Sequence, residues 1–262
     1  MNVRTTSVAG QFYPGEPSHL EQLLEGFFRK AVDGRDARGI VSPHAGFVYS
    51  GKTAARAYTA IDPSFDGTFV ILGPSHRGFL TCASAVPWET PLGILETDTA
   101  FVDRMEVEVD EFSHRDEHSL EVQMPFIKYR FPRSRVVPVM MGAQDPASAA
   151  HMAERILEAV HRTGRDVRIV ASSDFSHYVP EAEARRDDLA AIAPLLTLDT
   201  DGFYRKVRDL GVSACGYGPI SAMVLAAKGL GAQKAELLQY TTSGDVTGDR
   251  GQVVGYAAIA VM

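Results

Sequence analysis

The chain has 262 residues, of which 45% are hydrophobic and 23% charged, with a formal net charge of -7 and a sequence pI near 5.6. These proportions are those of soluble globular proteins, and they exclude a fibrous, disordered or membrane-embedded chain. The acidic balance and the lack of a Lys/Arg-rich run exclude nucleic acid as a partner on electrostatic grounds.

The sequence contains no segment typical of a membrane span or a signal peptide. No apolar run approaches the roughly 20 residues needed to cross a bilayer, and the opening stretch MNVRTTSVAGQFYPG lacks the apolar core of a signal peptide. We therefore expect a cytoplasmic protein without membrane contact.

The two cysteines form no disulfide framework and no C-x-x-C pair. No repeat or linker divides the chain, so residues 1–262 are expected to form a single domain.

Short β-branched runs alternate with longer amphipathic segments along the chain. This pattern predicts an α/β fold, a three-layer α/β/α sandwich around a largely parallel or mixed central sheet. The expected strands, in chain order, are 39–42, 68–72, 82–86, 135–140, 167–171, 236–241 and 253–261. The expected helices are 18–31, 51–60, 99–107, 119–129, 146–161, 181–196, 201–210 and 218–228. Residues 88–98 are expected to be a surface loop or a hairpin.

Three of the expected strands end in the same way. GIVSPHAGFVYSG delivers His44, FVILGPSHRG delivers His76, and RIVASSDFSHY delivers Asp174 and His177. Because the carboxyl ends of parallel strands meet at one edge of a sheet, we expect these side chains in a common crevice. A lone histidine is more often hydrogen-bonded within a loop. Several imidazoles with a carboxylate provide the donors that a divalent metal needs, so the pattern predicts a metal site.

A cysteine offers a further donor in GVSACGYGPISAMVLAAKGLG. Cys215 lies between small residues and just before an apolar helix, whose N-terminus is expected to lower the thiol pKa. It is a metal ligand or reactive thiol on one interpretation and a small buried core residue on the other. Cys82, in TCASAV, is typical of a strand interior and is expected to be a buried structural thiol.

The segment DEHSLEVQMPFIKYRFP adds Glu117, His118 and Glu121. Residues 117 and 121 are four apart and share a helix face, with His118 one step round. They are either acids that suit the positive end of a helix dipole or groups that support a metal-bound imidazole or a substrate. His114 is expected in a flexible acidic loop.

Five segments together carry a family resemblance: SPHAGFVYSG, ILGPSHRG, EHSLEVQMPF, SSDFSHY and ACGYGPI. In this order they resemble the Memo family, whose prokaryotic members are also called component B of the AmmeMemoRadiSam system. The similarity extends from VAGQFYPG near the start to GYAAIA near the end. The family is similar to the class III extradiol ring-cleaving dioxygenases of the LigB type, which implies a LigB-like fold.

In those dioxygenases two histidines and a glutamate hold a non-haem ferrous ion. The resemblance implies His44 and His76 as the two histidine ligands, with Cys215 at the place of the glutamate. It also implies His177 as the acid/base histidine, with Asp174 beside it.

The same resemblance implies that Tyr49 and His118 line the pocket, where Glu117 would also lie. It implies a divalent metal cofactor, with iron expected first and copper or zinc as alternatives. A small molecule or a peptide is expected in the crevice. A functional link to radical-SAM and AMMECR-type proteins also follows from the name of the system.

The presence of a cysteine at position 215, where the dioxygenases have a glutamate, bears on which of three functions is expected. A thiolate is softer than a carboxylate and easily oxidised, so a metal pocket is better supported than ordinary ring cleavage. The first hypothesis is an oxidoreductase with a mononuclear iron or copper site, in which His177, oriented by Asp174, moves protons. The second is zinc-type hydrolysis, with His177 or Glu117 as the base. The third is a metal-carrying or peptide-binding protein that uses the pocket without turnover.

Overall fold

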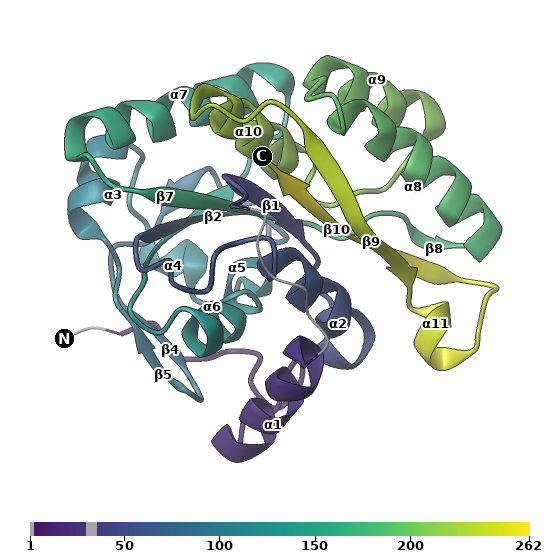
Figure 1. Ribbon diagram of the computed structural model, residues 1–262, viewed down its shortest axis with the longest axis horizontal. Coiled ribbons are helices and arrows are strands. Elements are labelled where there is room, and N and C mark those ends of the chain that lie inside the picture. Colours follow the sequence, from purple (N-terminus) through teal and green to yellow (C-terminus); the bar gives the residue numbers. More distant parts are fainter. Residues whose placement is uncertain (1–2, 30–35) are drawn as a thin grey trace.

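The computed structural model describes residues 3–29 and 36–262, and its centre is a mixed eight-stranded sheet (Figure 1). The strand order is β3-β6-β2-β7-β1-β10-β8, with β9 paired to β10. Its strands are β1 (Gly39–Ser42), β2 (Thr68–Pro74), β3 (Cys82–Ala83), β6 (Arg135–Met141), β7 (Val167–Ser172), β8 (His177–Val179), β9 (Ala235–Thr242) and β10 (Val253–Val261). The expected α/β fold with a mixed sheet is thereby confirmed.

The parallel part of this sheet is central. Strand β2 runs parallel to both β6 and β7, and β7 runs parallel to β1. Strand β10 is antiparallel to β1, β8 and β9, and the two-residue β3 is antiparallel to β6. The carboxyl ends of β2, β7 and β1 therefore lie next to one another at one edge of the sheet, which is where ligands bind in open α/β sheets.

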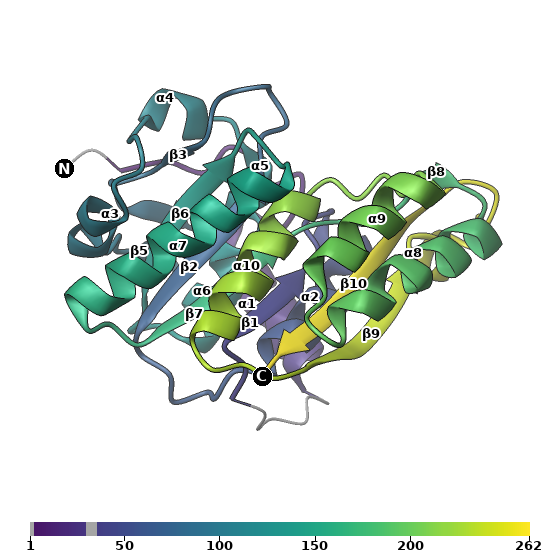
Figure 2. The same ribbon diagram turned by 90° about the horizontal axis from the view of Figure 1, so that it is seen from above.

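Helices cover both faces of the sheet, because the apolar side chains of β2 point alternately to one face and to the other. Phe69 and Ile71 pack into one core, and Val70 and Leu72 into the other, because successive strand side chains point to opposite faces. The helices of the first core are α1 (Pro17–Phe28), α2 (Phe47–Tyr58), α5 (His118–Glu121) and α6 (Met124–Arg130). Those of the second are α3 (Thr99–Met105), α7 (Pro146–Thr163), α8 (Glu181–Leu195), α9 (Thr200–Leu210) and α10 (Tyr217–Gly229). Of these, α7, α8, α9 and α10 lie over the sheet in Figure 2.

The expected helix over residues 119–129 is wrong, because the structure has α5 and α6 there with a break at 122–123. Pro125 lies in the first turn of α6, where its missing N–H and its ring end the preceding helix. The expected end of the first helix at residue 31 lies outside the described residues.

The segment 88–98 contains a hairpin, made by β4 (Trp88–Thr90) and β5 (Gly93–Leu95). Strand β8 and the short helices α4 (Glu111–His114) and α11 (Gly244–Thr247) were not anticipated by the sequence pattern. In the part of the chain that the structure describes, every helix is too short or too polar to span a bilayer.

Candidate metal centre

The histidines at the strand ends line one pocket of about 390 Å³. His44 follows β1 by two residues, His76 follows β2 by two, and Asp174 follows β7 by two, while His177 begins β8. The structure thus brings together side chains from three adjacent parallel strands. The lining residues are Phe12, His44, Ala45, Gly46, Tyr49, His76, His118, Asp174, His177, Tyr178 and Val254.

Three imidazoles form the tightest group of donors in this pocket. One ligand nitrogen from each of His44, His76 and His118 lies within 4.8 Å of the others. The ring of His76 is 4.4 Å from that of His118 and 5.3 Å from that of His44, measured between centroids. This three-histidine group, in which His44 is buried and His76 and His118 are partly open to the pocket, could bind a metal ion, since neutral imidazole is a common metal donor.

The charge state of the group suits a cation. Burial lowers the pKa of His44 well below its ordinary value, and the neighbouring His118 and His76 lower it further. Burial likewise lowers the pKa of His118, with His76 adding to the effect. Both rings are therefore neutral at pH 7 and keep a lone pair for a metal.

Glu117 lies behind His76 and is completely buried. Its Oε1 is 2.9 Å from His76 Nδ1, and its Oε2 accepts the backbone N–H of His76 at 2.8 Å. Burial opposes ionisation of Glu117, but these hydrogen bonds outweigh it and lower the pKa to about 2. Because a carboxylate only accepts, His76 carries a proton on Nδ1, which leaves Nε2 as the nitrogen that could bind a metal.

Cys215 contacts the group from the loop before α10. Its Sγ is 3.2 Å from His44 Nε2 and receives the backbone N–H of Asp174 at 3.3 Å. The expected lowering of the thiol pKa is wrong: burial raises the pKa of Cys215, and the Asp174 carboxylate raises it further. Desolvation of a thiolate outweighs a helix N-terminus here.

Gly216 allows the cysteine loop to approach β7. A Cβ at this position would lie 2.6 Å from the carbonyl oxygen of Ser172 and 2.7 Å from the Cβ of Ser173. The glycine therefore serves close packing of this chain against itself. Only with this contact does the thiol reach the end of β7.

His177 is oriented by a backbone carbonyl. Its Nδ1 is 2.9 Å from the carbonyl oxygen of Ser213, so Nδ1 carries the proton and Nε2 is available as a base. The Asp174 carboxylate instead accepts the backbone N–H of His44 at 2.9 Å. Burial raises the pKa of Asp174. Ser213, rather than Asp174, thus holds the His177 ring.

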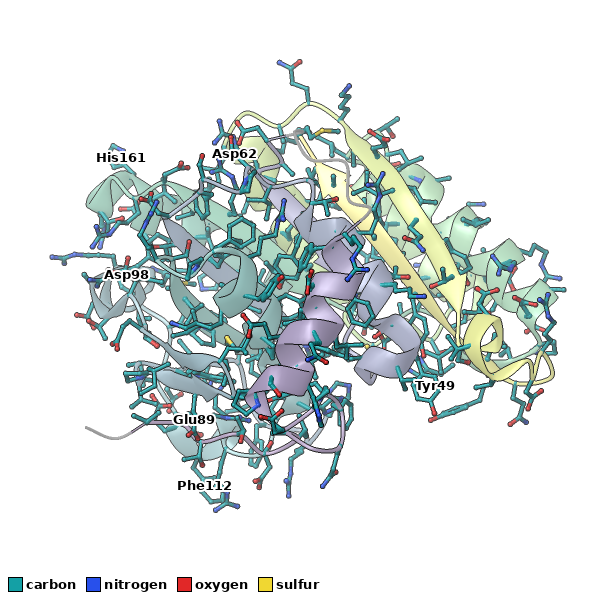
Figure 3. All side chains as sticks on the ribbon, turned by 60° about the horizontal axis from the view of Figure 1, so that its bottom comes forward. Tyr49, Asp62, Glu89, Asp98, Phe112 and His161 are labelled. Atoms are coloured by element: carbon teal, nitrogen blue, oxygen red, sulfur yellow. The ribbon has the colours of Figure 1, made fainter. Side chains whose placement is uncertain are left out.

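Aromatic side chains form the rim of the pocket. Tyr49, near the start of α2, is 42% exposed and projects outward from the molecule in Figure 3. Phe12 packs against His118 with ring centroids 4.9 Å apart. Tyr178 is 72% exposed and has a φ of 58°, rare for an aromatic residue.

Phe12 and Tyr178 also line the pocket, although neither is among the predicted site residues. Tyr178 follows His177 in the DFSHY motif, and regular strand alternation would direct the two side chains to opposite faces. A register shift in the β8–β10 pair at residues 253 and 254 accompanies the left-handed Tyr178, so both rings reach the pocket. Phe12 carries no local signal, because only the fold brings it to this edge.

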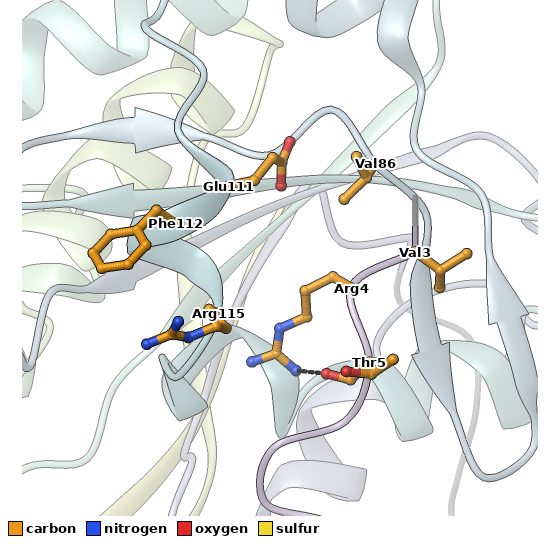
Figure 4. Close-up of a pocket in the computed structure, with 7 residues that line it drawn as sticks. All are labelled: Val3, Arg4, Thr5, Val86, Glu111, Phe112 and Arg115. Carbon is orange, nitrogen blue, oxygen red and sulfur yellow. Dashed lines mark hydrogen bonds between the residues drawn. The ribbon is translucent and has the colours of Figure 1, made fainter. Parts of the chain in front are cut away.

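A second cavity, of about 280 Å³, lies beside the N-terminal segment (Figure 4). Arg4 lines it, but its guanidinium already pairs with Glu121 and donates to the carbonyl oxygens of Thr5 and His114. Glu111, on the opposite wall, accepts from Ser84 and Ala85. These polar groups hold the chain together and leave little capacity for a ligand.

Cys82 and His114 contact each other outside the pocket. Cys82 is buried in β3 as expected, with its Sγ 3.6 Å from His114 Nε2. The expectation of a flexible loop at His114 is wrong, since this residue is fully buried in α4. Packing against Trp88 explains the burial, with ring centroids 5.9 Å apart.

Comparison with known proteins gives consistent matches over the whole chain. A family model described as Memo-like protein matches residues 4–260. A MEMO1 family protein of Methanosarcina barkeri is 46% identical over 266 residues, covering 99% of this chain and 100% of the relative. MEMO1 family proteins of Archaeoglobus fulgidus and Methanosarcina mazei are 44% and 42% identical, over 98% and 100% of this chain and of each relative.

Proposed function

The chain belongs to the Memo-like protein family, and we propose that it binds one non-haem iron or copper ion for redox chemistry akin to that of LigB-type extradiol dioxygenases. The observation that carries this proposal is the convergence of His44 and His76, which follow the parallel strands β1 and β2, with His118, which begins α5. A bound ion of this kind would supply Lewis acidity and one-electron redox chemistry.

Two ligand sets share His44 and His76. In the first, Cys215 is the third ligand, supported by its 3.2 Å approach to His44 Nε2. In the second, His118 is the third ligand, supported by its ring nitrogen within 4.8 Å of the other two. The residues fit a cation in both cases, because two imidazoles are joined by a thiol or by a third imidazole, next to the buried carboxylate of Glu117.

Protein groups around this site would handle protons and water. His177 offers Nε2 at the pocket wall, with Nδ1–H held by Ser213, so Nε2 can take and return a proton. Phe12 and the two rim tyrosines would limit water around a bound small molecule. The substrate would be a small molecule or a peptide side chain that fits this pocket.

Elemental analysis after anaerobic purification tests the metal proposal. We expect iron or copper to follow the wild type and to be lost from His76→Ala, while His151→Ala, at an exposed site on α7, keeps it. Loss from Cys215→Ser but not from His118→Ala would select the thiolate set, and the reverse would select three histidines. A wild type that takes up no metal under any loading condition would refute the proposal.

A second experiment separates redox catalysis from metal carriage. Carriage is favoured by Cys215, since a thiol next to a redox metal is itself oxidisable. Oxygen uptake by the iron-loaded protein with catechol as the probe, abolished in His177→Gln, would support catalysis. Tight metal binding without oxygen uptake would support carriage, and hydrolysis by the zinc-loaded protein without oxygen would support a hydrolase.

A further inference from the structure

His44 has one contact on each ring nitrogen. Its Nδ1 lies 2.9 Å from Ser172 Oγ, and its Nε2 lies 3.2 Å from Cys215 Sγ at the pocket. A neutral imidazole carries one proton on either nitrogen, and each of these contacts can exist with the imidazole as donor or as acceptor. The Nδ1 contact alone therefore leaves the tautomer open, although only the Nδ1–H form leaves Nε2 as a lone pair.

The other contacts of Ser172 remove this ambiguity. Its Oγ is 2.6 Å from the carbonyl oxygen of Ser119 and 2.8 Å from Gln123 Nε2. A hydroxyl has one proton and two acceptor lone pairs. The Ser119 carbonyl can only accept, so it takes the serine proton, and the Gln123 amide nitrogen can only donate. The remaining lone pair of Ser172 can only accept, which requires a proton on His44 Nδ1.

The orientation of the Gln123 amide is determined in the same way. Its Nε2 also lies 3.0 Å from the carbonyl oxygen of Pro43, and its Oε1 lies 3.0 Å from the Tyr58 hydroxyl. A flipped amide would place its oxygen against the Pro43 carbonyl, two acceptors facing each other in a dry interior. Burial raises the pKa of Tyr58, so its hydroxyl is protonated and donates to Oε1.

We infer that Ser172, held by Gln123, is a positioning residue that locks His44 in the Nδ1–H tautomer and directs the Nε2 lone pair into the pocket. The network joins residues far apart in sequence: the residue numbers of His44 and Ser172 differ by 128, and those of Gln123 and Ser172 by 49. Its effect on metal affinity rests on the proposed function, whereas the tautomer itself does not.

Nitrogen-15 NMR of the histidine rings tests the tautomer in the metal-free, full-length protein. The His44 signals are identified by their loss in His44→Gln. We expect a protonated Nδ1 and an unprotonated Nε2 in the wild type. A protonated Nε2 would overturn the inference without any need for a variant.

Variants then test the role of the serine hydroxyl. Ser172→Ala removes the acceptor for Nδ1–H, so the proton is expected to shift toward Nε2, where Cys215 Sγ can accept it. Ser172→Thr restores the hydroxyl and is expected to restore the wild-type signal. Ser42→Ala is the matched control: Ser42 pairs with Ser172 across β1 and β7, and its buried Oγ makes no hydrogen bond with any described residue. An unchanged tautomer in Ser172→Ala would overturn the assignment.

Zinc affinity, measured by competition with a chelator, gives the second readout. Loss of a group that orients a ligand histidine typically weakens metal binding about 10–100-fold, which is the effect expected for Ser172→Ala and not for Ser42→Ala. Equal zinc affinity in both variants would refute a role in metal binding. If even the wild type binds no metal while the tautomer results hold, the proposed function fails and the positioning role stands.

Discussion

Glu121→Gln tests how strongly the N-terminal segment is held beside the histidine pocket. Glu121 is fully buried and accepts from Arg4, from both polar groups of Ser7, from the backbone N–H of Val8 at 3.0 Å and from the Tyr13 hydroxyl at 2.6 Å. A glutamine replaces one of these acceptor oxygens by a donor that faces other donors. It also leaves the buried guanidinium of Arg4 without a counter-charge.

Breaking a buried ion pair in this way costs about 3–5 kcal/mol, which is a large part of the free energy of unfolding of an ordinary domain. Urea denaturation at pH 7 measures this loss. Glu154→Gln, at an exposed position on α7, provides the control. A loss below about 1 kcal/mol would refute the reasoning, because the penalty for an uncompensated buried charge would then be absent.

The pH dependence of the same variant has a defined sign. Burial opposes ionisation of Glu121, but Arg4 and the hydrogen bonds outweigh it and lower the pKa below the ordinary value. A depressed carboxyl pKa stabilises the fold above the unfolded-state value, and this stabilisation disappears as the pH falls through the folded-state value. Glutamine does not titrate, so the difference between wild type and variant should shrink on acidification. A difference that grows would contradict the assignment.

Three further substitutions have defined outcomes. Glu117→Gln should weaken metal binding about 10–100-fold in a chelator competition, because the amide nitrogen replaces an oxygen that accepts an N–H of His76. The control is Asp116→Asn, at the exposed neighbouring position, which should leave metal binding unchanged. Tyr178→Gly should raise the free energy of unfolding by about 1 kcal/mol in urea denaturation, because glycine relieves the left-handed φ of 58°. Little packing is lost, since the tyrosine is 72% exposed. A decrease in the free energy of unfolding would show that the ring is needed for packing. Gly216→Ala should lower the free energy of unfolding by about 1–3 kcal/mol, because the added methyl group overpacks against Ser172 and Ser173. The control is Gly26→Ala, where the added methyl group meets open space and should be neutral or stabilising. Equal melting temperatures for the two variants would refute the close approach at Gly216.

Much of this fold is determined by local pattern. The β-branched runs that become β1, β2, β6 and β7 are visible in the sequence, because strands buried on both faces need continuous apolar side chains. The shared crevice could be predicted from one rule, since histidines that follow parallel strands emerge at the same edge. His44 and His76 needed no more information than this.

The two acids of α5 show where pattern stops being sufficient. Their spacing predicts a shared helix face, but Glu117 caps α5 and holds His76, while Glu121 accepts from Arg4 and the N-terminal segment. Glu117 precedes this four-residue helix and Glu121 is its last residue, so their side chains point in different directions and find partners in distant parts of the chain. The sequence alone has no means of assigning these partners.

The strands of the sheet, the histidines that follow them and the family motifs can all be recognised in the sequence. The contact of Cys215 with His44, the hold of Ser213 on His177 and the role of Ser172 in the His44 tautomer are visible only in the folded chain. Apolar periodicity and strand-end chemistry act within a few residues. Hydrogen-bond direction and ångström-scale donor distances depend instead on how strands and loops far apart in the chain pack together.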